Sequence, residues 1–160
     1  MGAGVAEVAA AAGYDVVLRS RHQDTADAML AGLAKSLARQ VEKEKRTQAE
    51  ADAIAGRVKA TTHLGELVDV DLVIESVVED LGVKKALFAE LDSVCKPGAI
   101  LATNTSTLPV VELAMATGRP DLVCGIHFFN PAPAMSLVEV VRPITAADAT
   151  VAAALAFAES

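Results

Sequence analysis

Aromatic side chains are scarce in this sequence of 160 residues, which contains no tryptophan, one tyrosine and four phenylalanines. Alanine is abundant instead, with 32 residues, and 52% of the chain is hydrophobic. A core of such small side chains suits helices that pack closely against a sheet. The length is that of one domain, which can bury a core without the help of disulfides or metals.

Other scarce features exclude whole classes of protein. Basic residues number 14 against 21 acidic ones, and the net charge of −7 argues against non-specific binding to nucleic acid. No apolar run approaches the roughly 18 residues of a membrane span, and no basic segment precedes an apolar core as in a secretory signal. The two cysteines, Cys95 and Cys124, lack the Cys-x-x-Cys spacing of a metal site. They are expected to be buried thiols, and the protein is expected to be cytoplasmic.

The pattern of apolar residues predicts helices that alternate with strands. Helices are expected at residues 2–12, 24–45, 47–57, 83–95, 110–117 and 146–158, and strands at residues 15–18, 71–78, 99–103, 122–128 and 137–141. Residues 24–57 are expected to form a helical hairpin outside the sheet, with Asp24 as N-cap and a capping box of Thr47 and Glu50. The alternation predicts an α/β fold with a doubly wound, mostly parallel sheet.

The first predicted helix opens with Gly2-Ala3-Gly4, is ended by Gly13, and is followed by a strand. This order is that of the second half of a Rossmann dinucleotide fingerprint, in which N–H groups at a helix N-terminus bind a pyrophosphate. The strand and the two earlier glycines of the full fingerprint are absent. The alternative is an alanine-rich helix whose glycines serve only packing.

The residue after the next strand bears on the choice of cofactor. In a NAD-binding domain an acid at this place holds the ribose 2′-hydroxyl. Here the residue is Ser20, which lies between Arg19 and Arg21. A hydroxyl between two guanidiniums suits a 2′-phosphate better than a bare ribose. The alternative is a pair of solvated arginines.

A histidine and a glutamate are spaced for a hairpin. His127 lies at a predicted strand end, Glu139 follows 12 residues later within SLVEVV, and Pro133 is their midpoint. A chain reversal there would place the two side chains opposite each other. A carboxylate beside an imidazole fixes its tautomer and stabilises the imidazolium, which makes a general base. The alternative is a buried pair whose two side chains only satisfy each other's hydrogen-bonding groups.

Polar residues also follow two other predicted strands. Asn104 and Ser106 come after the strand at residues 99–103, where doubly wound sheets bind their ligands. A turn or an N-cap would use the same residue types. Glu79 and Lys84 accompany the start of the helix at residues 83–95, and the alternative for them is an ordinary acidic helix start.

Four segments together carry a resemblance to a known family. MGAGVAEVAAAAG, DLVIESVVEDLGVKKALFAELD, ATNTST and GIHFFNPAPAMSLVEVV resemble the NAD-binding domain of the 3-hydroxyacyl-CoA dehydrogenases, which include 3-hydroxybutyryl-CoA dehydrogenases. The resemblance runs along essentially the whole chain. It implies a Rossmann-like domain and an oxidoreductase of fatty acid metabolism (beta-oxidation) that interconverts 3-hydroxyacyl-CoA and 3-oxoacyl-CoA.

The resemblance implies a role for each catalytic candidate. His127 would take the proton of the substrate hydroxyl, and Glu139 would orient His127 and stabilise its charged form. Ser106 matches a serine near the substrate oxygen and the nicotinamide. Asn130 matches the cofactor-side asparagine of the HFFNP motif.

The resemblance also implies the binding residues. The cofactor, NAD with NADP as the alternative, is expected to contact Gly2, Ser20, Arg21, Glu79, Lys84, Ser106 and Asn130. The acyl-CoA substrate is expected to contact Ser106 and, in the helical hairpin, Ser36 and Lys43. A lysine there supplies local positive charge for the CoA phosphates in a negatively charged protein.

The sequence departs from the family's pattern at both ends. The family's first strand and first two fingerprint glycines are missing before Met1. The chain stops at Ser160, before the last strand of the nucleotide domain and the helical C-terminal domain that dimerises the family's members. We therefore expect residues 1–160 to be a truncated dinucleotide-binding domain, in which strands next to the missing one lose their ladder partners. The alternative to a dehydrogenase is a non-catalytic remnant, or a fragment that binds a dinucleotide or CoA.

Overall fold

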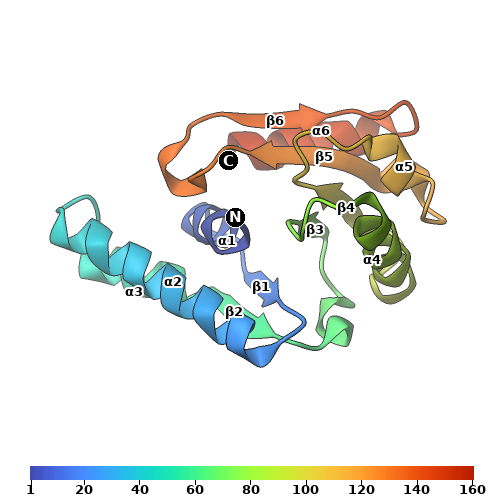
Figure 1. The fold of residues 1–160 in the computed structure, drawn as a ribbon. Coiled ribbons are helices and arrows are strands. Elements are labelled where there is room, and N and C mark those ends of the chain that lie inside the picture. Colours follow the sequence, from blue (N-terminus) through green and yellow to red (C-terminus); the bar gives the residue numbers. More distant parts are fainter. The chain divides into compact units, whose positions relative to one another are not determined.

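The computed structural model describes residues 1 to 160, which form two compact units. The first unit comprises Met1–Glu66 and Asn130–Ala134, and the second comprises Leu67–Phe129 and Met135–Ser160. Strands and helices alternate along the chain (Figure 1), so the predicted α/β class is confirmed. No helix combines the length and the apolar composition that crossing a lipid bilayer requires.

The first unit contains a two-stranded parallel sheet. Its elements are α1 (Gly2–Ala11), β1 (Val16–Arg19), α2 (Gln23–Glu42), α3 (Gln48–Gly56), β2 (Val58–Thr61) and the short 3₁₀ helix η3 (Ala132–Ala134). The register of β1 and β2 pairs Val16 with Val58 and Arg19 with Thr61. Gly13 ends α1 with a φ of +99°, as predicted, because glycine adopts this left-handed conformation without a steric penalty.

Strand β2 was not predicted, since no element was expected between residues 57 and 71. The strand has only four residues, Val58 to Thr61, and its alternation of apolar and polar side chains is too short to indicate a strand. Its strand conformation depends on pairing with β1, a segment far away in the sequence. Four alternating residues by themselves do not separate a strand from a loop.

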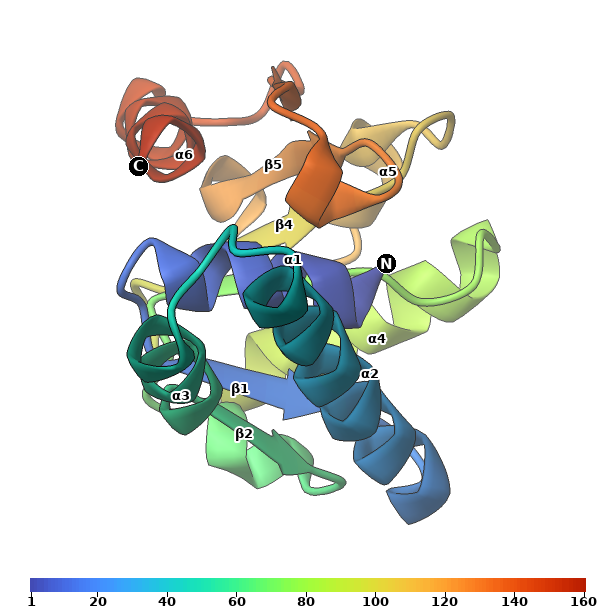
Figure 2. The ribbon, with the colours of Figure 1, turned by 90° about the vertical axis from the view of Figure 1, so that its left-hand side faces the viewer.

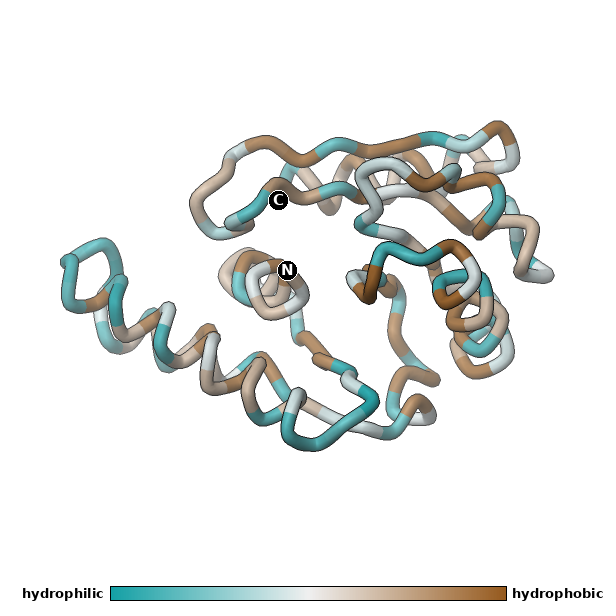
Figure 3. Tube along the Cα trace, viewed as in Figure 1, coloured by the Kyte–Doolittle hydropathy of each residue, from teal (hydrophilic) through white to brown (hydrophobic).

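The helical hairpin packs through one apolar face. Leu33 and Leu37 of α2 are buried in one cluster with Ala51 and Ile54 of α3 and with Ala10 of α1. Figure 2 shows α2 and α3 beside α1. The hairpin therefore shares the core of the first unit, while the turn between its helices is strongly hydrophilic, as are the start of α2 and scattered residues along it (Figure 3).

The ends of α2 differ from those predicted. The helix begins at Gln23 with His22 as its N-cap, so Asp24 lies in the first turn and is not the cap. It ends at Glu42, before the predicted residue 45. Glu44 has a φ of +54° and turns the chain toward α3.

The second unit contains a four-stranded sheet. After the 3₁₀ helix η1 (Leu64–Leu67), its elements are β3 (Leu72–Glu75), α4 (Leu81–Val94), β4 (Ile100–Thr103), α5 (Val110–Ala114), the 3₁₀ helix η2 (Pro120–Leu122), β5 (Val123–Phe128), β6 (Val138–Val141) and α6 (Asp148–Glu159). The strand order is β3-β4-β5-β6; the first three strands are parallel, and β6 is antiparallel to β5.

The strands form two sheets and not the single sheet that the sequence analysis expected. Parallel pairing predominates in both sheets, as predicted. Strand β1 pairs only with β2, and β3 pairs only with β4, so each has one edge without a strand partner.

Strand β3 ends at Glu75, earlier than the predicted residue 78. The backbone N–H of Val77 donates to the Glu75 carboxylate over 2.5 Å, and this bond turns the chain out of the strand. Val77 and Val78 are exposed. Their apolar side chains extended the predicted strand because a sequence pattern does not distinguish an exposed valine from a buried one.

Strands β4 and β5 form the buried centre of the second unit. Leu101, Val123 and Ile126 are fully buried there. Cys95 and Cys124 are free and buried, as predicted. Burial raises the pKa of the Cys124 thiol to about 11, so this thiol is protonated at neutral pH and chemically inert.

Arg119 closes the C-terminal end of α4. Its guanidinium donates to the Asp92 carboxylate over 2.6 Å and to the carbonyl oxygens of Asp92, Cys95 and Lys96. Carbonyl groups of this kind are left without partners by the last turn of a helix. Burial alone would raise the pKa of Asp92, but hydrogen bonds from the Gly118 N–H and the Arg119 guanidinium outweigh it and lower the pKa below its usual 3.8.

The lowered pKa of Asp92 predicts a loss of stability in acid. Because the folded-state pKa lies below the unfolded one, the unfolded chain binds the proton first as the pH falls. The stabilisation is complete above the unfolded pKa and is lost as the pH falls through the folded pKa. Asp92→Asn should therefore flatten the decline of the urea midpoint between about pH 5 and pH 2.5.

Glu90→Gln is the matched control for this measurement. Glu90 lies on the same helix and is exposed, and no ion pair holds it. This variant removes the same charge and should leave the pH dependence as it is in the wild type. Identical slopes for Asp92→Asn and the wild type would contradict the prediction.

Candidate active site

The carboxyl ends of β3, β4 and β5 lie at one edge of the four-stranded sheet, because these strands are parallel. Strand β6 is antiparallel and begins at this edge. Glu75 is opposite Thr103, and His127 is opposite Glu139. Doubly wound sheets bind their ligands at this edge. Polar side chains gathered here are therefore candidates for catalysis.

His127 and Glu139 form the pair that their spacing predicts. The register of β5 and β6 pairs them directly, and Nδ1 of His127 lies 2.9 Å from Oε2 of Glu139. A carboxylate can only accept a hydrogen bond, so Nδ1 carries a proton and Nε2 is left to accept one. The histidine side chain is 15% exposed and the glutamate 52%. The pair is therefore accessible to solvent and is not fully buried.

Asn104 connects the three strand ends next to His127. Its backbone N–H donates to the carbonyl oxygen of Glu75 over 2.8 Å, and its side-chain oxygen accepts from the Phe128 N–H over 2.7 Å. Phe128 directly follows His127 in β5. Beside it, the ring of Phe129 packs against the His127 imidazole with 4.6 Å between their centres. These contacts hold the end of β5 that carries the imidazole.

Lys84 of α4 and Glu75 of β3 form a buried ion pair. The exposed fractions of the two side chains are 1% and 0%, and Lys84 Nζ lies 2.7 Å from Glu75 Oε1. The second Glu75 oxygen accepts the Thr103 hydroxyl over 2.8 Å, and the first also accepts the Val77 N–H. Both charges are thus paired and hydrogen-bonded, as buried charges must be if they are not to destabilise the fold.

Glu79 extends this ion pair toward the loop after β4. Its carboxylate lies 3.2 Å from Lys84 Nζ and accepts a hydrogen bond from the Thr105 hydroxyl. Burial alone would raise the pKa of Glu79, but hydrogen bonds from Thr105, Lys84 and the Ser106 N–H outweigh it and lower the pKa below its usual 4.5. Glu79 is therefore ionised at neutral pH and holds the loop that carries Ser106.

Ser106 is exposed at the tip of this loop. The hydroxyl oxygen of the preceding Thr105 accepts the N–H groups of Thr107, over 3.3 Å, and of Leu108, over 3.0 Å. These bonds fix the backbone of the loop. The Ser106 hydroxyl has no partner within the chain and is available to a ligand.

In the first unit, the N-terminus of α1 is open to an anion. Met1 provides no side-chain cap, and the first turn contains no acid. Such a helix start presents free N–H groups and the positive end of the helix dipole, which suit a pyrophosphate. A Cβ added to Gly2 would lie 3.2 Å from Met29 Cε, and one added to Gly4 would lie 3.3 Å from Pro133 Cδ, so the glycines also serve packing. These residues fit the part of a dinucleotide site that the sequence contains.

Two of the three residues expected to contact the acyl-CoA substrate lie on the hairpin. Lys43 is exposed at the C-cap of α2, and the hydroxyl of Ser36 accepts from Gln40 Nε2 over 3.4 Å. Gln40 also donates to the buried Glu7 over 2.5 Å and accepts from Arg46 Nε over 2.9 Å. This chain of side chains connects α1 to the turn that follows Lys43.

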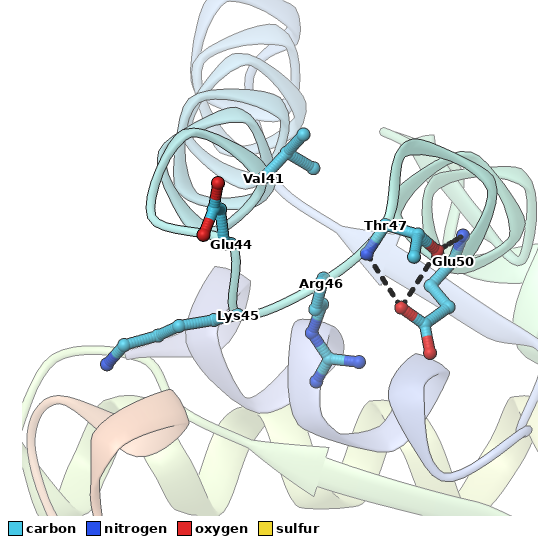
Figure 4. Close-up of a pocket in the computed structure, with 6 residues that line it drawn as sticks. All are labelled: Val41, Glu44, Lys45, Arg46, Thr47 and Glu50. Atoms are coloured by element: carbon cyan, nitrogen blue, oxygen red, sulfur yellow. Dashed lines mark hydrogen bonds between the residues drawn. The ribbon is translucent and has the colours of Figure 1, made fainter.

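The turn between α2 and α3 forms a pocket, drawn in Figure 4. It is lined by Val41, Glu44, Lys45, Arg46, Thr47 and Glu50. The predicted capping box lies in it and is confirmed: the Thr47 N–H donates to the Glu50 carboxylate over 2.7 Å, and the Glu50 N–H donates to the Thr47 hydroxyl over 3.2 Å. The pocket contains charges of both signs, so its charge alone favours neither anions nor cations.

The predicted site residues are divided between the two units. The first unit contains Gly2, Ser20, Arg21, Ser36, Lys43 and Asn130, and the second contains Glu79, Lys84, Ser106, His127 and Glu139. Within the second unit, the structure brings His127 to Glu139, and Glu79 to Lys84 and the Ser106 backbone. Asn130 is exposed.

The residues that hold Lys84 and Glu79 were not predicted from the sequence. These are Glu75, Thr103 and Thr105. Glu75 carried a usable signal, because an acid within an apolar strand is rarely buried without a partner. The two threonines carried none, since threonine is common in strands and turns.

Three comparisons with known proteins agree in their result. Residues 1–160 match the 3-hydroxyacyl-CoA dehydrogenase, NAD binding domain, family. The chain is 48% identical over 141 residues to the 3-hydroxybutyryl-CoA dehydrogenase of Clostridioides difficile, covering 88% of this chain and 50% of that protein. It is 42% identical over 159 residues to a probable 3-hydroxybutyryl-CoA dehydrogenase of Bacillus subtilis, covering 99% of this chain and 55% of that protein.

Among solved structures, the (S)-3-hydroxybutyryl-CoA dehydrogenase of Ralstonia eutropha matches with a TM-score of 0.97 and 35% identity, covering 99% of this chain and 56% of that one. The chain spans about half the length of the curated relatives it matches. The likeness in sequence and in fold extends over nearly all of this chain.

Proposed function

This chain belongs to the 3-hydroxyacyl-CoA dehydrogenase family, as its NAD-binding domain, and from that premise we propose that it interconverts 3-hydroxyacyl-CoA and 3-oxoacyl-CoA in fatty acid metabolism. The observation that carries the proposal is the accessible pair of His127 and Glu139 at the carboxyl edge of the sheet. We further propose that residues 1–160 act as a dinucleotide-binding domain in the cytoplasm, a location that suits two free, buried thiols.

The pair suits removal of the proton from the substrate's 3-hydroxyl group. In the oxidative direction the hydroxyl loses this proton, C3 loses a hydride, and a ketone remains. Nε2 of His127 accepts the proton, because Nδ1 already donates to Glu139. The Glu139 carboxylate keeps the ring in this tautomer and stabilises the imidazolium that forms. A bound nicotinamide would supply the acceptor for the hydride.

The other residues of the second unit bind and orient. The exposed Ser106 hydroxyl donates to the substrate oxygen, and the network of Glu79 and Lys84 holds its loop in place. In the reductive direction, His127 returns the proton to the oxygen of the ketone. Glu79, whose side chain is 43% exposed, and the exposed Asn130 also contact the cofactor in this proposal. Lys84 is 1% exposed, so it acts by holding the Glu79 carboxylate in place, and the expected direct contact with the cofactor does not fit its burial.

The residues of the first unit bind the charged parts of both ligands. The open N-terminus of α1 at Gly2 receives the pyrophosphate of the dinucleotide. Lys43, exposed at the end of α2, supplies positive charge to the phosphates of the acyl-CoA, and Ser36 lies on the same helix.

The test is an assay of the purified chain with 3-hydroxybutyryl-CoA and NAD or NADP, followed through the absorbance of the reduced cofactor. We expect turnover that requires the thioester and does not occur with free 3-hydroxybutyrate. Cofactor binding without any turnover would overturn the catalytic proposal in favour of a fragment that binds a dinucleotide or CoA.

A further inference from the structure

The residues at the carboxyl end of β1 form a basic loop. Arg19 is the last residue of the strand, and Ser20 and Arg21 follow it before His22 caps α2. The Ser20 N–H donates to the carbonyl oxygen of Thr61 over 3.0 Å, which fixes the start of the loop against β2. The loop contains no carboxylate.

The side chains of Arg19, Ser20 and Arg21 donate no hydrogen bond within the chain. Arg21 is exposed and has no ion pair, and Nε of Arg19 is buried without a hydrogen-bond partner. The Ser20 hydroxyl accepts only a long bond of 3.5 Å from the His22 N–H, so its own proton remains free to be donated. The loop thus presents two guanidiniums and a hydroxyl donor without a negatively charged partner.

Carboxylates of the neighbouring elements do not neutralise these arginines. Asp24, the first acid after the loop, lies in the first turn of α2 and not at the strand end. Asp27 accepts a hydrogen bond from Gln23 over 2.8 Å. Glu66 accepts the Thr61 hydroxyl over 2.7 Å. The positive charge of the loop therefore remains available to a ligand.

In dinucleotide-binding domains, the residue type at the carboxyl end of this strand decides which of the two nicotinamide cofactors binds. An acid there accepts a hydrogen bond from the ribose 2′-hydroxyl, whereas an arginine accommodates a 2′-phosphate, which it can bind through two parallel hydrogen bonds. We propose that Arg19, Ser20 and Arg21 bind the 2′-phosphate of NADP, and that this chain prefers NADP(H) to NAD(H). The inference rests on the proposed dinucleotide-dependent function and specifies its cofactor. The proposed phosphate site is locally positive, although the protein as a whole has a net charge of −7.

Parallel fluorescence titrations of the 160-residue chain with NADPH and NADH test this inference. We expect NADPH to bind at least about tenfold more tightly, because charge-assisted hydrogen bonds to the phosphate are gained. Adenosine 2′,5′-bisphosphate should displace NADPH more effectively than 5′-AMP, since the two compounds differ only in the 2′-phosphate. Added salt should weaken the preference by screening the exposed guanidinium of Arg21.

Three variants assign the preference to the loop. Arg21→Gln should lower the affinity for NADPH about tenfold and leave that for NADH unchanged. Ser20→Asp should reverse the preference, because its carboxylate repels the phosphate and accepts from the ribose hydroxyl. Arg57→Gln is the matched control: it removes an exposed positive charge next to the opposite end of the same sheet and should change neither affinity.

Four results would overturn the inference: equal affinities, tighter binding of NADH, no saturable binding of either cofactor to the folded chain, or unchanged NADPH binding in Arg21→Gln. The dehydrogenase assay separates this failure from that of the proposed function. Turnover without a preference for NADPH rejects only the cofactor assignment. A preference for NADPH without turnover of 3-hydroxybutyryl-CoA rejects only the catalytic proposal.

Discussion

Replacing His127 by glutamine is expected to lower the turnover of 3-hydroxybutyryl-CoA by about 10²–10⁴-fold, the usual contribution of a positioned general base. Glutamine cannot take up the hydroxyl proton. The fold should survive, because the side chain lies at the exposed edge of the sheet and the strand pairing around it uses backbone groups. Initial rates should show the loss in kcat, while cofactor titration should show unchanged affinity.

Two further variants show whether the lower turnover is caused by the loss of His127 as the general base. His63→Gln changes an exposed histidine in a loop of the first unit and should leave turnover unchanged. Glu139→Gln retains the imidazole but removes the carboxylate that fixes its tautomer, so its turnover should lie between those of the wild type and His127→Gln. Turnover of His127→Gln within about twofold of the wild type would reject the assigned base.

Replacing Lys84 by methionine is expected to lower the free energy of unfolding by about 3–5 kcal/mol, the cost of leaving a buried charge without its partner. Methionine fills similar space but removes the ammonium that lies 2.7 Å from Glu75 and 3.2 Å from Glu79. Glu75 would remain fully buried, with only the Thr103 hydroxyl and the Val77 N–H as donors. Urea unfolding followed by circular dichroism measures the loss.

A second substitution at Glu75 separates charge from packing. The Lys84→Met/Glu75→Gln double variant should be more stable than Lys84→Met alone, because no unpaired charge is left in the interior. Lys85→Met is the matched control: its ion pair with Glu112 is exposed, with side chains 40% and 49% accessible, and should contribute only about 0–1 kcal/mol. A Lys84→Met loss no larger than that of Lys85→Met, or a double variant no more stable than Lys84→Met, would contradict this account.

The pairing of His127 with Glu139 could be predicted because its causes are local. A strand presents alternate side chains to the same face, and a turn at the midpoint sets the register of an antiparallel pair. These two rules place the residues opposite each other, as the register of β5 and β6 confirms. Their accessibility could not be predicted, since it depends on how the other elements cover the strand end.

The network around Lys84 shows where such reasoning fails. Lys84 and Glu79 were predicted to contact the cofactor, but nothing near them in the sequence indicated that Thr103 completes a buried cluster with Glu75. Thr103 reaches Glu75 because β3 and β4 pair in parallel, and that pairing joins segments separated by a whole helix. A charge is stable in the interior only if such distant partners exist.

The periodicity of apolar residues, the capping box of Thr47 and Glu50, and the glycine at position 13 were sufficient to locate the helices, because each acts over one or two turns of chain. The class of the fold followed from the alternation of elements. Tertiary structure alone decided that residues 58–61 form a strand, that β3 stops at Glu75, and that the strands form two sheets. The strand at residues 58–61 and the division into two sheets depend on hydrogen-bond partners, or the lack of them, far away in the sequence, and a pattern within one segment does not record these partners. The end of β3 depends on a side-chain bond between Glu75 and the Val77 N–H, which the apolar pattern does not show.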